Sequence, residues 1–476
     1  MTTHKLISEI VEQDICIGCG LCAAVCPKKN IRMEWSDKGE IIPVIDECCG
    51  EDICARLCIA TCPILVPGAI NASPNRSDIV ESLIGDYEAC YAGYDNDPAL
   101  RQRGTSGGML TWLLTELLEK GDIDGVITAV KSDDAEDSIF QFGILRTAED
   151  VRRAAGSKYY PVEAGSVLKQ ILSDKSDDVY ALVGLPCLLQ GVQIARTKYK
   201  RLDRKIKYTF SLTCGQLPNA AYTEVLAQCS GVKKSSLVTV DYRNKAGTTS
   251  ASNYVFLPTN KAGESGRPLY WVGEPSYLWE NSFFIHGACK FCDDLFGRSS
   301  DAAFMDAWLP EYTTDTQGHS LILVRNTSIN DAFSRGAAAG SCQIKPVPVA
   351  DIINSQSTQI TKKTEMLSAN LYFAKQNGLR ITDRAIPPSK TMFKRWKKDI
   401  SLQWHTMKES KRIWAELKSQ GEEQFFFTET AALHRKISVR RNLLYIQQGV
   451  RKLVNNPLGT VRNVFLHQLR RNRSNA

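Results

Sequence analysis

Hydrophobic positions in the central part of the chain repeat either every three to four residues or every second residue. Leucines at positions 110, 113, 114, 117 and 118 predict a helix over residues 110–120 with one apolar face, and residues 123–130 follow as a strand. The same alternation continues with predicted strands over 139–145, 178–183 and 205–212 and predicted helices over 166–172, 188–199 and 219–229. This order predicts an α/β arrangement.

After residue 237 the apolar stretches become shorter and have the period of strands. They cover 238–242, 254–257 and 269–272, and a polar loop over 259–268 separates the last two. Short strands without helices between them are typical of antiparallel pairing. We therefore expect an antiparallel addition to the α/β core, so that the fold as a whole is mixed (α+β / α/β).

Proline-containing breaks divide the chain into three parts. Pro74-Asn75-Arg76-Ser77 has the composition of a linker, and Pro387-Pro388 marks a second break. A chain of 476 residues has room for two or three domains. The predicted domains are residues 1–75, 76–385 and 386–476.

The last of these parts has the pattern of a basic amphipathic helix. Its apolar residues recur at spacings of three and four, with one turn skipped: Phe393, Trp396, Ile400, Trp404, Met407, Trp414 and Leu417. From Arg380 to Ala476 there are 21 Lys and Arg against 7 Asp and Glu, a net charge of +14; because the whole chain carries +7, residues 1–379 carry −7. Three interpretations compete: packing on the acidic body, adsorption to an anionic membrane surface, or docking on an acidic partner. Nucleic acid is not an expected partner, because no recognition motif accompanies the charge.

The composition is that of a globular protein except for its sixteen cysteines. Hydrophobic residues make up 43% and charged residues 23% of the chain, no N-terminal stretch resembles a signal peptide, and no apolar run is long enough to span a bilayer. We expect a cytoplasmic protein, peripheral at the inner face of the membrane if the tail binds lipid. Cytoplasmic thiols stay reduced, so the cysteines indicate metal binding.

Four cysteines near the N-terminus have the spacing of a bacterial ferredoxin. The run is Cys16-x2-Cys19-x2-Cys22-x3-Cys26-Pro27. One short loop presents three thiolates to three irons of a cubane, and the cysteine before proline reaches a second cluster. A zinc site usually has two separated Cys-x2-Cys pairs instead. The run therefore predicts a ferredoxin-type module with 4Fe-4S clusters.

The second half of this module is less regular. A mirror-image run requires cysteines at positions 52, 55, 58 and 62, and only Cys58 and Cys62 are present, with Cys54 one residue early and Cys48 and Cys49 upstream. Crossed ligation assigns Cys16, Cys19, Cys22 and Cys62 to the first cluster, and Cys26, Cys54, Cys58 and one of Cys48 or Cys49 to the second. A cluster that lacks one ligand would be a three-iron species, so the sequence does not fix the type of cluster.

A turn rich in small residues, Gly104-Thr105-Ser106-Gly107-Gly108, precedes the leucine helix. Small residues let a ligand approach the backbone closely, and the start of a helix favours negative charge. The turn therefore indicates a site for a cofactor phosphate, although many surface turns also contain paired glycines.

Four more cysteines lie on loops of the central part. They are Cys187 in Gly184-Leu185-Pro186-Cys187, Cys214 after the predicted strand 205–212, and the pair Cys289-x2-Cys292. Loops at strand ends are where α/β folds build sites, so these cysteines indicate a third cluster. The alternative is that Cys187 and Cys214 are small buried apolar residues. Cys90, Cys229 and Cys342 have no partner pattern and are expected to pack in the core.

Several short motifs occur in order through the central part. They are Tyr91-Ala92-Gly93-Tyr94-x-x-Asp97, Arg101, Ser106-Gly107-Gly108, Ile123-Asp124-Gly125-Val126, Gly156-Ser157-Lys158-Tyr159, Gly184-Leu185-Pro186-Cys187, Cys214-Gly215, Cys289-x2-Cys292-Asp293 and Asp306-Ala307-Trp308. In this order they closely resemble the coenzyme F420 hydrogenase/dehydrogenase beta-subunit family. The resemblance covers roughly residues 85–330, and many bacterial members carry a ferredoxin domain in front of this core.

The resemblance implies cofactors and the residues that hold them. Members of the family bind FAD and a 4Fe-4S cluster in this core, and they reduce or oxidise coenzyme F420, or a chlorophyll-type pigment in some relatives. The implied FAD contacts are Thr105, Ser106, Gly107, Gly108, Ser157, Lys158 and Tyr159, and the implied ligands of the core cluster are Cys187, Cys214, Cys289 and Cys292. Lys158 would pair with an FAD phosphate or with the flavin ring; otherwise it is a solvated surface lysine.

Two positions depart from the family pattern. Leu185 stands where the family usually has threonine, which removes a hydroxyl near the implied flavin. Gly215-Gln216 stands where many relatives have His-Gly, so any role of that histidine toward protons or substrate is unfilled here.

Together these features predict an iron–sulfur flavoprotein oxidoreductase. Clusters pass single electrons and a flavin exchanges a hydride or an electron pair, so the predicted relay joins a ferredoxin-type donor or acceptor to coenzyme F420 or another small-molecule substrate. The sequence indicates neither the catalytic residues nor the direction of electron flow. The alternative is an electron-transfer subunit without a substrate site that serves a partner enzyme, in cell-surface polysaccharide biosynthesis if it follows relatives with this layout. A zinc-stabilised scaffold is the third interpretation.

Overall fold

The computed structural model describes residues 5–46, 57–65 and 79–455. The chain forms two compact units, Met1–Ala415 and Glu416–Ala476. The first unit contains the ferredoxin-type module, the central sheet and most of the long helix α17 (Lys390–Gln420). The second unit contains the end of α17, α18 (Phe426–Glu429) and α19 (Ala431–Asn455).

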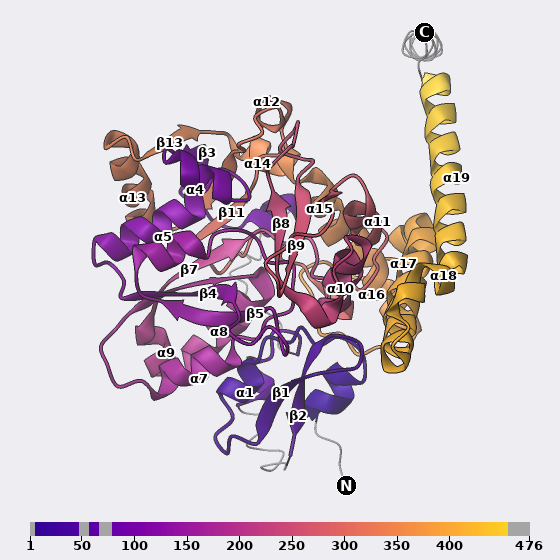
Figure 1. Ribbon diagram of the computed structural model, residues 1–476, viewed down its shortest axis with the longest axis horizontal. Helices are drawn as coiled ribbons and strands as arrows, with labels where there is room; N and C mark the ends of the chain where they lie inside the picture. Colours follow the sequence, from indigo (N-terminus) through magenta and orange to yellow (C-terminus); the bar gives the residue numbers. More distant parts are fainter. Residues whose placement is uncertain (1–4, 47–56, 66–78, 456–476) are drawn as a thin grey trace. The chain divides into compact units, whose positions relative to one another are not determined.

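An eight-stranded sheet with the order β13-β3-β12-β11-β7-β6-β4-β5 forms the centre of the first unit (Figure 1). Its strands are β3 (Ala89–Asp95), β4 (Gly125–Lys131), β5 (Phe140–Leu145), β6 (Tyr180–Gly184), β7 (Ile206–Leu212), β11 (Ala302–Asp306), β12 (Ser320–Val324) and β13 (Cys342–Pro346). Strands β4, β6, β7 and β11 pair in parallel, and β12 is antiparallel to both β11 and β3. The carboxyl ends of β3, β4, β6, β7 and β11 therefore meet at one edge of the sheet.

Helices cover both faces of this sheet because successive strand residues point to opposite sides. One face packs against α5 (Met109–Glu119), α6 (Ala148–Arg153) and α13 (Thr327–Ala338). The other face packs against α7 (Gly165–Ser173), α8 (Pro186–Lys198) and α9 (Lys200–Lys205) at one end, and against α3 (Ile79–Ile84), α14 (Val349–Ser355) and α15 (Ser357–Thr361) at the other. The predicted α/β arrangement is confirmed, with element ends shifted by one to three residues.

A separate three-stranded sheet confirms the predicted antiparallel addition. Strand β9 (Val255–Asn260) pairs in antiparallel fashion with β8 (Leu237–Asn244) and with the two-residue β10 (Leu269–Tyr270). Helices α10 (Ala220–Cys229) and α11 (Glu274–Glu280) pack beside it. The fold is therefore mixed, with parallel and antiparallel parts.

The N-terminal module packs closely on the central sheet and its helices. It contains a hairpin of β1 (Ile31–Trp35) and β2 (Ile41–Ile45) and the short helix α1 (Leu21–Ala24). Helix α1 lies on α7, where a Cβ added to Gly165 would stand 2.2 Å from the carbonyl oxygen of Gly20. A Cβ added to Gly191 on α8 would stand 2.3 Å from Leu21. Only glycine allows these close approaches, so the position of the module is fixed by backbone packing.

The apolar positions of α17 are buried within the first unit. Ile400, Trp404 and Met407 belong to one apolar cluster with Phe291 and Leu367. The indole N–H of Trp404 donates to the Asn370 side chain at 2.9 Å. Further along the helix, the indole N–H of Trp414 donates to the Glu224 side chain at 3.0 Å. Of the three interpretations of the predicted tail, packing on the body therefore applies to α17 as far as Trp414.

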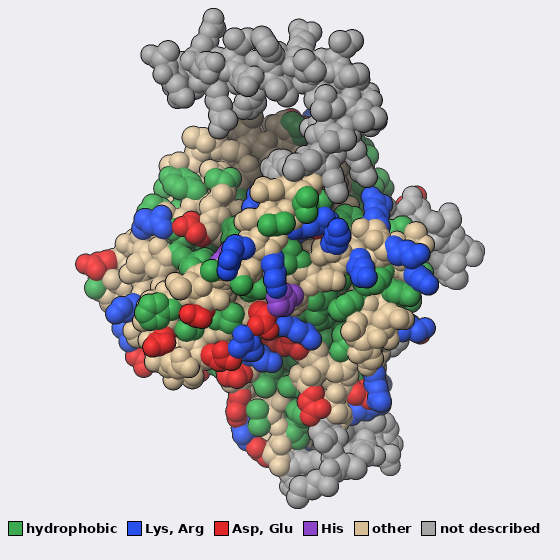
Figure 2. All heavy atoms as spheres, turned by 90° about the vertical axis from the view of Figure 1, so that its right-hand side faces the viewer, with side chains coloured by type: hydrophobic (Ala, Val, Ile, Leu, Met, Phe, Trp, Pro, Cys, Tyr) green, Lys and Arg blue, Asp and Glu red, His purple; other side chains and the backbone are tan. Residues whose placement is uncertain are grey.

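On the face drawn in Figure 2, the Lys and Arg side chains of the described residues are interspersed with hydrophobic and acidic ones. None of the helices in the described ranges combines the length and the hydrophobicity that crossing a bilayer requires.

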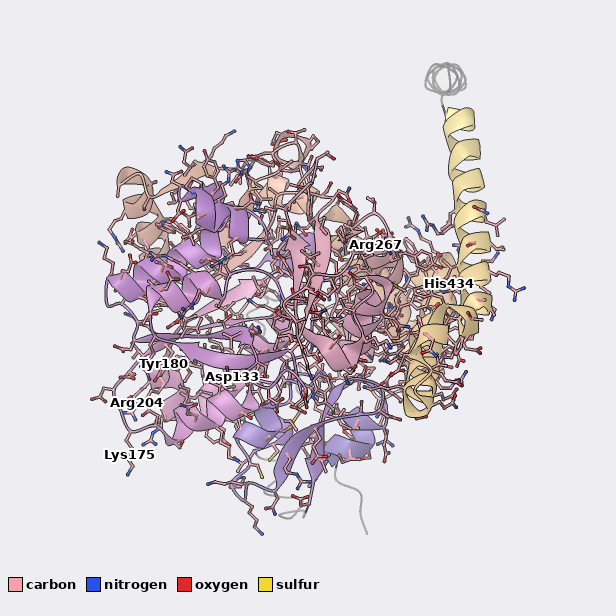
Figure 3. All side chains as sticks on the ribbon, in the orientation of Figure 1. Asp133, Lys175, Tyr180, Arg204, Arg267 and His434 are labelled. Carbon is pink, nitrogen blue, oxygen red and sulfur yellow. The ribbon has the colours of Figure 1, made fainter. Side chains whose placement is uncertain are left out.

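Charged side chains at the amino ends of the parallel strands form a structural network. Lys205, 6% exposed, donates to Asp174 at 2.8 Å, and Arg146 donates to the hydroxyl of Tyr180 at 3.1 Å. Lys175 and Arg204, labelled in Figure 3, instead point away from the body and are exposed. This network lies at the sheet edge opposite to the strand ends that carry the cysteines, so we assign it to stability alone.

Candidate functional site

The carboxyl edge of the sheet gathers most of the predicted site residues. Cys187 lies at the start of α8, directly after β6, and Cys214 follows β7 by two residues. Asp306 ends β11, and the turn 104–108 packs against the end of β3. In open α/β sheets ligands bind outside the carboxyl ends of the strands, so this edge is the expected place for a site.

The four central cysteines come together at this edge. The thiol of Cys187 lies within electrostatic reach of those of Cys292, Cys214 and Cys289. Burial raises the pKa of Cys214 to about 12 and raises the pKa of the other two thiols for which a shift is resolved, Cys187 and Cys289. The backbone N–H of Leu217 donates to the Cys289 sulfur at 3.3 Å. Four largely buried thiols on three separate loops are too many for chance packing of small apolar residues.

These thiols are neighbours but do not converge on a single point. In the described part of the chain, no three Cys, His, Asp or Glu side chains converge closely enough to hold one metal ion. A zinc ion draws its ligands to one atom, whereas each thiolate of a cubane binds a different iron. Thiolates around a cluster are therefore expected to be neighbours without meeting at one point.

The N-terminal cysteines form a second group. Cys16, Cys19, Cys22 and Cys62 are mutually within electrostatic reach, as predicted for the first cluster. The N–H of Gly18 donates to the Cys16 sulfur at 3.4 Å. Cys26 and Cys58, predicted for the second cluster, are buried in one apolar cluster. Their predicted partners Cys48 or Cys49 and Cys54 lie outside the described residues.

The two groups of cysteines approach each other at Cys19 and Cys187, whose thiols lie within electrostatic reach. The carbonyl of Cys19 accepts a hydrogen bond from the N–H of Ala164 at the start of α7. Cys19 also packs against the apolar cluster that contains Leu188 of α8. The packing of α1 on α7 and α8 therefore brings a ferredoxin-type cysteine next to a central one.

The turn 104–108 is held tightly between two strands. A Cβ on Gly107 would stand 2.4 Å from the carbonyl oxygen of Gly93 on β3, and the Gly107 N–H donates to the Ser320 hydroxyl on β12 at 3.1 Å. Gly108 has φ +82° and forms the N-cap of α5. Ser106 donates to the His319 carbonyl. The paired glycines are thus required by the sheet, and the turn opens its Thr105 and Ser106 side toward a cleft.

This cleft contains about 360 Å³ of empty space, open to solvent. Its walls include Thr105, Ser106, Arg243, Lys245, Tyr254, Asp306, Trp308 and His319. Arg243 pairs with Asp306 at 2.7 Å and lies over the rings of Tyr254, at 4.2 Å, and Trp308, at 5.3 Å. Its buried Nε has no hydrogen-bond partner among the described residues. A cation held between aromatic rings, with a donor to spare, fits a planar anionic ligand.

A lysine that the sequence did not single out braces the cleft. The Lys245 ammonium donates to the carbonyls of Arg101, Ser106 and Gln317 at 2.7, 2.8 and 2.6 Å. It therefore ties the turn to two other loops. Arg243 lies near the end of β8 and Lys245 directly follows the strand, far from every motif, and no signal in the sequence marks them.

The second predicted FAD segment contacts the turn 104–108, but its side chains make their contacts in different places. The Ser157 hydroxyl donates to Thr105 Oγ1 at 3.3 Å, which joins the two segments. The Tyr159 ring packs edge-on against Trp279 and Tyr242, and its hydroxyl lies within electrostatic reach of Arg243. The Lys158 ammonium bonds the carbonyls of Ala154 and Gly156, at 2.9 Å for the latter. Lys158 is therefore not a fully solvated surface lysine. Its two hydrogen bonds also do not direct the ammonium toward the cleft.

Asp95 is a buried acid at the same edge and allows a prediction on pH. Its side chain is 2% exposed, Oδ1 accepts from the Asp97 N–H at 2.9 Å, and Oδ2 has no partner in the described residues. Burial raises its pKa from 3.8 to about 6. Between pH 3.8 and about pH 6 the folded state keeps a proton on Asp95 that the unfolded chain has lost, so the free energy of unfolding falls as the pH rises through this range. Above this range the loss of stability is complete and stays constant.

Asp95→Asn is therefore expected to raise the melting temperature at pH 7.5 and to have little effect near pH 4. The gain corresponds to at most about 3 kcal/mol, from 1.36 kcal/mol per pKa unit. Thermal unfolding at both pH values measures it, with Asp133→Asn, an exposed acid labelled in Figure 3, as the control. An equal change at both pH values would mean that burial of the charge is not the cause.

The remaining cysteines and a histidine take structural positions. Cys90 and Cys342 are buried in the sheet, on β3 and β13, as expected for packing residues. Cys229 ends α10 away from the other thiols. His286 is 1% exposed, with Nδ1 3.2 Å from the Cys16 carbonyl oxygen.

Comparison with known proteins supports the interpretation of the site. Residues 90–169 match the model of the N-terminal part of the coenzyme F420 hydrogenase/dehydrogenase beta subunit, and residues 177–349 match that of its C-terminal part. Residues 9–32 match a 4Fe-4S binding domain.

Three relatives illustrate the range of similar proteins. One of the subunits of the F420H2 dehydrogenase of Methanosarcina mazei is 24% identical over 44% of this chain and 55% of its own length. The coenzyme F420-dependent sulfite reductase of Methanocaldococcus jannaschii is 29% identical over 67% of this chain and 45% of its own. The beta subunit of the coenzyme F420 hydrogenase of Methanosarcina barkeri is 23% identical over 63% of this chain and 98% of its own. The chain thus spans about half the length of the first two.

Proposed function

The chain belongs to the coenzyme F420 hydrogenase/dehydrogenase beta-subunit family and carries a 4Fe-4S binding domain, and on this basis we propose that it is an FAD- and iron–sulfur-dependent oxidoreductase. Its partners are a ferredoxin-type electron donor or acceptor and coenzyme F420 or another small molecule. The single observation that carries the proposal is the position of Cys19 beside Cys187. Two cysteine groups of cluster-binding type, on modules far apart in sequence, are neighbours.

The residues around the cleft fit FAD. The unpartnered Nε of Arg243 and the rings of Tyr254 and Trp308 suit a planar ring with carbonyl oxygens. The small residues of the turn 104–108, at the start of α5, suit a phosphate. Iron–sulfur clusters supply single electrons, and a flavin exchanges these for an electron pair or a hydride.

In this proposal the protein contributes position and protection. The central cysteines lie between the ferredoxin-type module and the cleft, at the same sheet edge. Gln216, next to Cys214 in the chain after Gly215, donates to the Trp279 carbonyl at 2.7 Å, and Trp279 packs on Tyr159 at a ring distance of 5.2 Å. The Tyr159 hydroxyl in turn lies within electrostatic reach of Arg243 in the cleft wall. A series of contacts thus runs from Gln216, beside the cysteines, to the cleft.

Anaerobic purification of the full chain tests the proposal. We expect a brown protein with iron and sulfide for three clusters, whose visible absorbance bleaches with dithionite and which releases FAD on denaturation. A colourless protein without iron or sulfide would contradict the proposal as a whole. Zinc in place of iron would instead favour a scaffold.

Arg243→Lys is expected to weaken FAD binding about tenfold, because it keeps the charge but loses Nε and the planar group that lies on Tyr254. Titration of the flavin-depleted protein with FAD measures the dissociation constant. Arg267→Lys is the matched control, since Arg267, which is labelled in Figure 3, is exposed. Equal affinities for the two variants would place FAD elsewhere.

An electron-transfer subunit without its own substrate is the second candidate. Two of the relatives named above are themselves called subunits, and this observation favours it. The isolated, reduced protein separates the two functions. Reoxidation of its flavin by coenzyme F420, without any partner protein, favours the oxidoreductase with its own site; reoxidation only after a partner enzyme is added favours the electron-transfer role.

A further inference from the structure

A buried lysine from the helical segment after the sheet faces the central cysteines. Lys363 is 2% exposed and lies in the π-helical turn η5 (Lys362–Met366), between α15 and α16 (Leu367–Gln376). Its ammonium lies within electrostatic reach of the thiols of Cys292, Cys214 and Cys289. Single π-turns inserted between α-helical turns are frequent at functional sites.

The same helical segment contacts the cysteine loops at a second point. Gln359 lies one turn before Lys363, and a Cβ on Gly215 would stand 2.2 Å from its Oε1. Helix α16 packs on η4 (Gly287–Phe291), the turn that carries Cys289. The segment is therefore firmly seated over the cysteines, and the direction of Lys363 follows from this packing.

Lys363 has no ion pair with a carboxylate anywhere in the described ranges. The two acids next to Cys292 are used elsewhere: Asp293 accepts from the Ala385 N–H at 3.1 Å, and Asp294 accepts from the Gly297 N–H at 2.8 Å. A buried cation without an anion costs several kcal/mol. Thiolates that bind iron supply that negative charge, so Lys363 is explained if the cysteines hold a cluster.

The cysteine group around Cys16 has charges of both signs near it. Glu163 lies within electrostatic reach of Cys19, and Glu40, which pairs with Lys411 at 2.6 Å, lies within reach of Cys16. The cation Arg384 lies within reach of Cys62. Each electron that a cluster accepts adds negative charge, which a nearby cation stabilises and a nearby carboxylate opposes. Charge and hydrogen bonds at the sulfurs are among the terms that set cluster potentials.

We propose that Lys363 is a positioning residue of the central cysteine group, whose ammonium lies beside Cys292, Cys214 and Cys289 and raises the reduction potential of a cluster bound there. An electron that reaches the central site is then stabilised by this cation. The inference rests on the proposed function, because it requires iron at the central cysteines. The inference adds a cation to the proposed site at the central cysteines, and no cysteine motif predicts this cation.

Lys363→Met and Lys363→Arg in the full chain test the inference, and Lys375→Met, an exposed position on α16, is the matched control. Anaerobic samples are assayed for iron and sulfide and then titrated potentiometrically with detection by electron paramagnetic resonance. We expect the midpoint of one cluster to fall by at least 59 mV in Lys363→Met, which is tenfold in the equilibrium constant of a one-electron couple. Lys363→Arg and Lys375→Met are expected to keep the wild-type midpoints.

Loss of one cluster in Lys363→Met, with full iron in Lys363→Arg, also supports the inference, because it shows that the bound cluster needs the cation. Unchanged midpoints in Lys363→Met with full iron overturn it, and so does equal loss of iron in both Lys363 variants. Failure of the proposed function is a different result, since the wild-type chain itself would then lack iron at the central site.

Discussion

Cys187→Ala is expected to reduce the rate at which an external one-electron donor reduces the flavin by at least ~100-fold, because changes to groups that only surround metal ligands already cost 10–100-fold. Cys187 is a central cysteine within reach of both groups, Cys214, Cys289 and Cys292 on one side and Cys19 on the other. Removing it takes one ligand from the proposed central cluster. FAD is expected to stay bound, since the cleft walls do not include Cys187.

Three measurements on anaerobic protein check this result: iron content, FAD content, and the rate of flavin reduction by reduced ferredoxin in a stopped-flow instrument. Cys229→Ala is the matched control, because Cys229 is also a half-buried cysteine but lies at the end of α10. A Cys187→Ala protein with wild-type iron and an unchanged rate would show that the central cysteines are packing residues. Loss of FAD together with iron would show that the central site also supports the cleft.

The ferredoxin-type cysteines were the most predictable part of the site, for a physical reason. A single loop must wrap a cubane, so its ligands Cys16, Cys19 and Cys22 are close in the sequence and their spacing is fixed. Cys62 could be placed by the same rule applied in reverse. The central cysteines obey no such rule, because the sheet brings three separate loops together; spacing alone left packing residues as an alternative, and the family resemblance was needed to connect them.

The elements of the sheet were predictable because hydrophobic periodicity reports burial directly. The predicted helix 110–120 and α5 differ by one residue at each end. The position of the charged residues was not predictable in this way. Arg243 and Lys363 look like ordinary surface charges in the sequence, and only contacts with Asp306 and Cys292, far along the chain, give them their roles.

In the basic tail, too, the roles of the charged residues were not predictable from hydrophobic periodicity. Its periodicity predicted an amphipathic helix, and α17 is one, but periodicity does not reveal that Lys411, which lies between the apolar positions, is buried. This lysine is 1% exposed and lies 3.2 Å from Asp14 and 2.6 Å from Glu40, two acids of the N-terminal module. Its ammonium lowers the pKa of Asp14, although burial acts in the opposite direction. Part of the charge of the tail is therefore used to hold the module in place.

Lys411→Met is expected to destabilise the first unit by about 3–5 kcal/mol, the usual cost of removing one partner from a buried ion pair. Methionine fills a similar volume, so the loss reports the two carboxylates left without their cation. Because the pKa of Asp14 is lowered in the folded state, its contribution is present at neutral pH and is lost only as the pH falls below 3.8. Urea denaturation at pH 7.5, followed by circular dichroism and by the visible absorbance of the clusters, measures the change.

Lys397→Met, at an exposed position of the same helix, is the matched control and is expected to change stability by less than about 0.5 kcal/mol. Adding Glu40→Gln to Lys411→Met is expected to recover part of the loss, because it removes one of the unpaired charges. If the Lys411 and Lys397 variants were equally stable, the ion pairs would contribute nothing to the attachment of the module. If the double variant were no better than Lys411→Met alone, the loss would come from packing of the lysine side chain rather than from its charge.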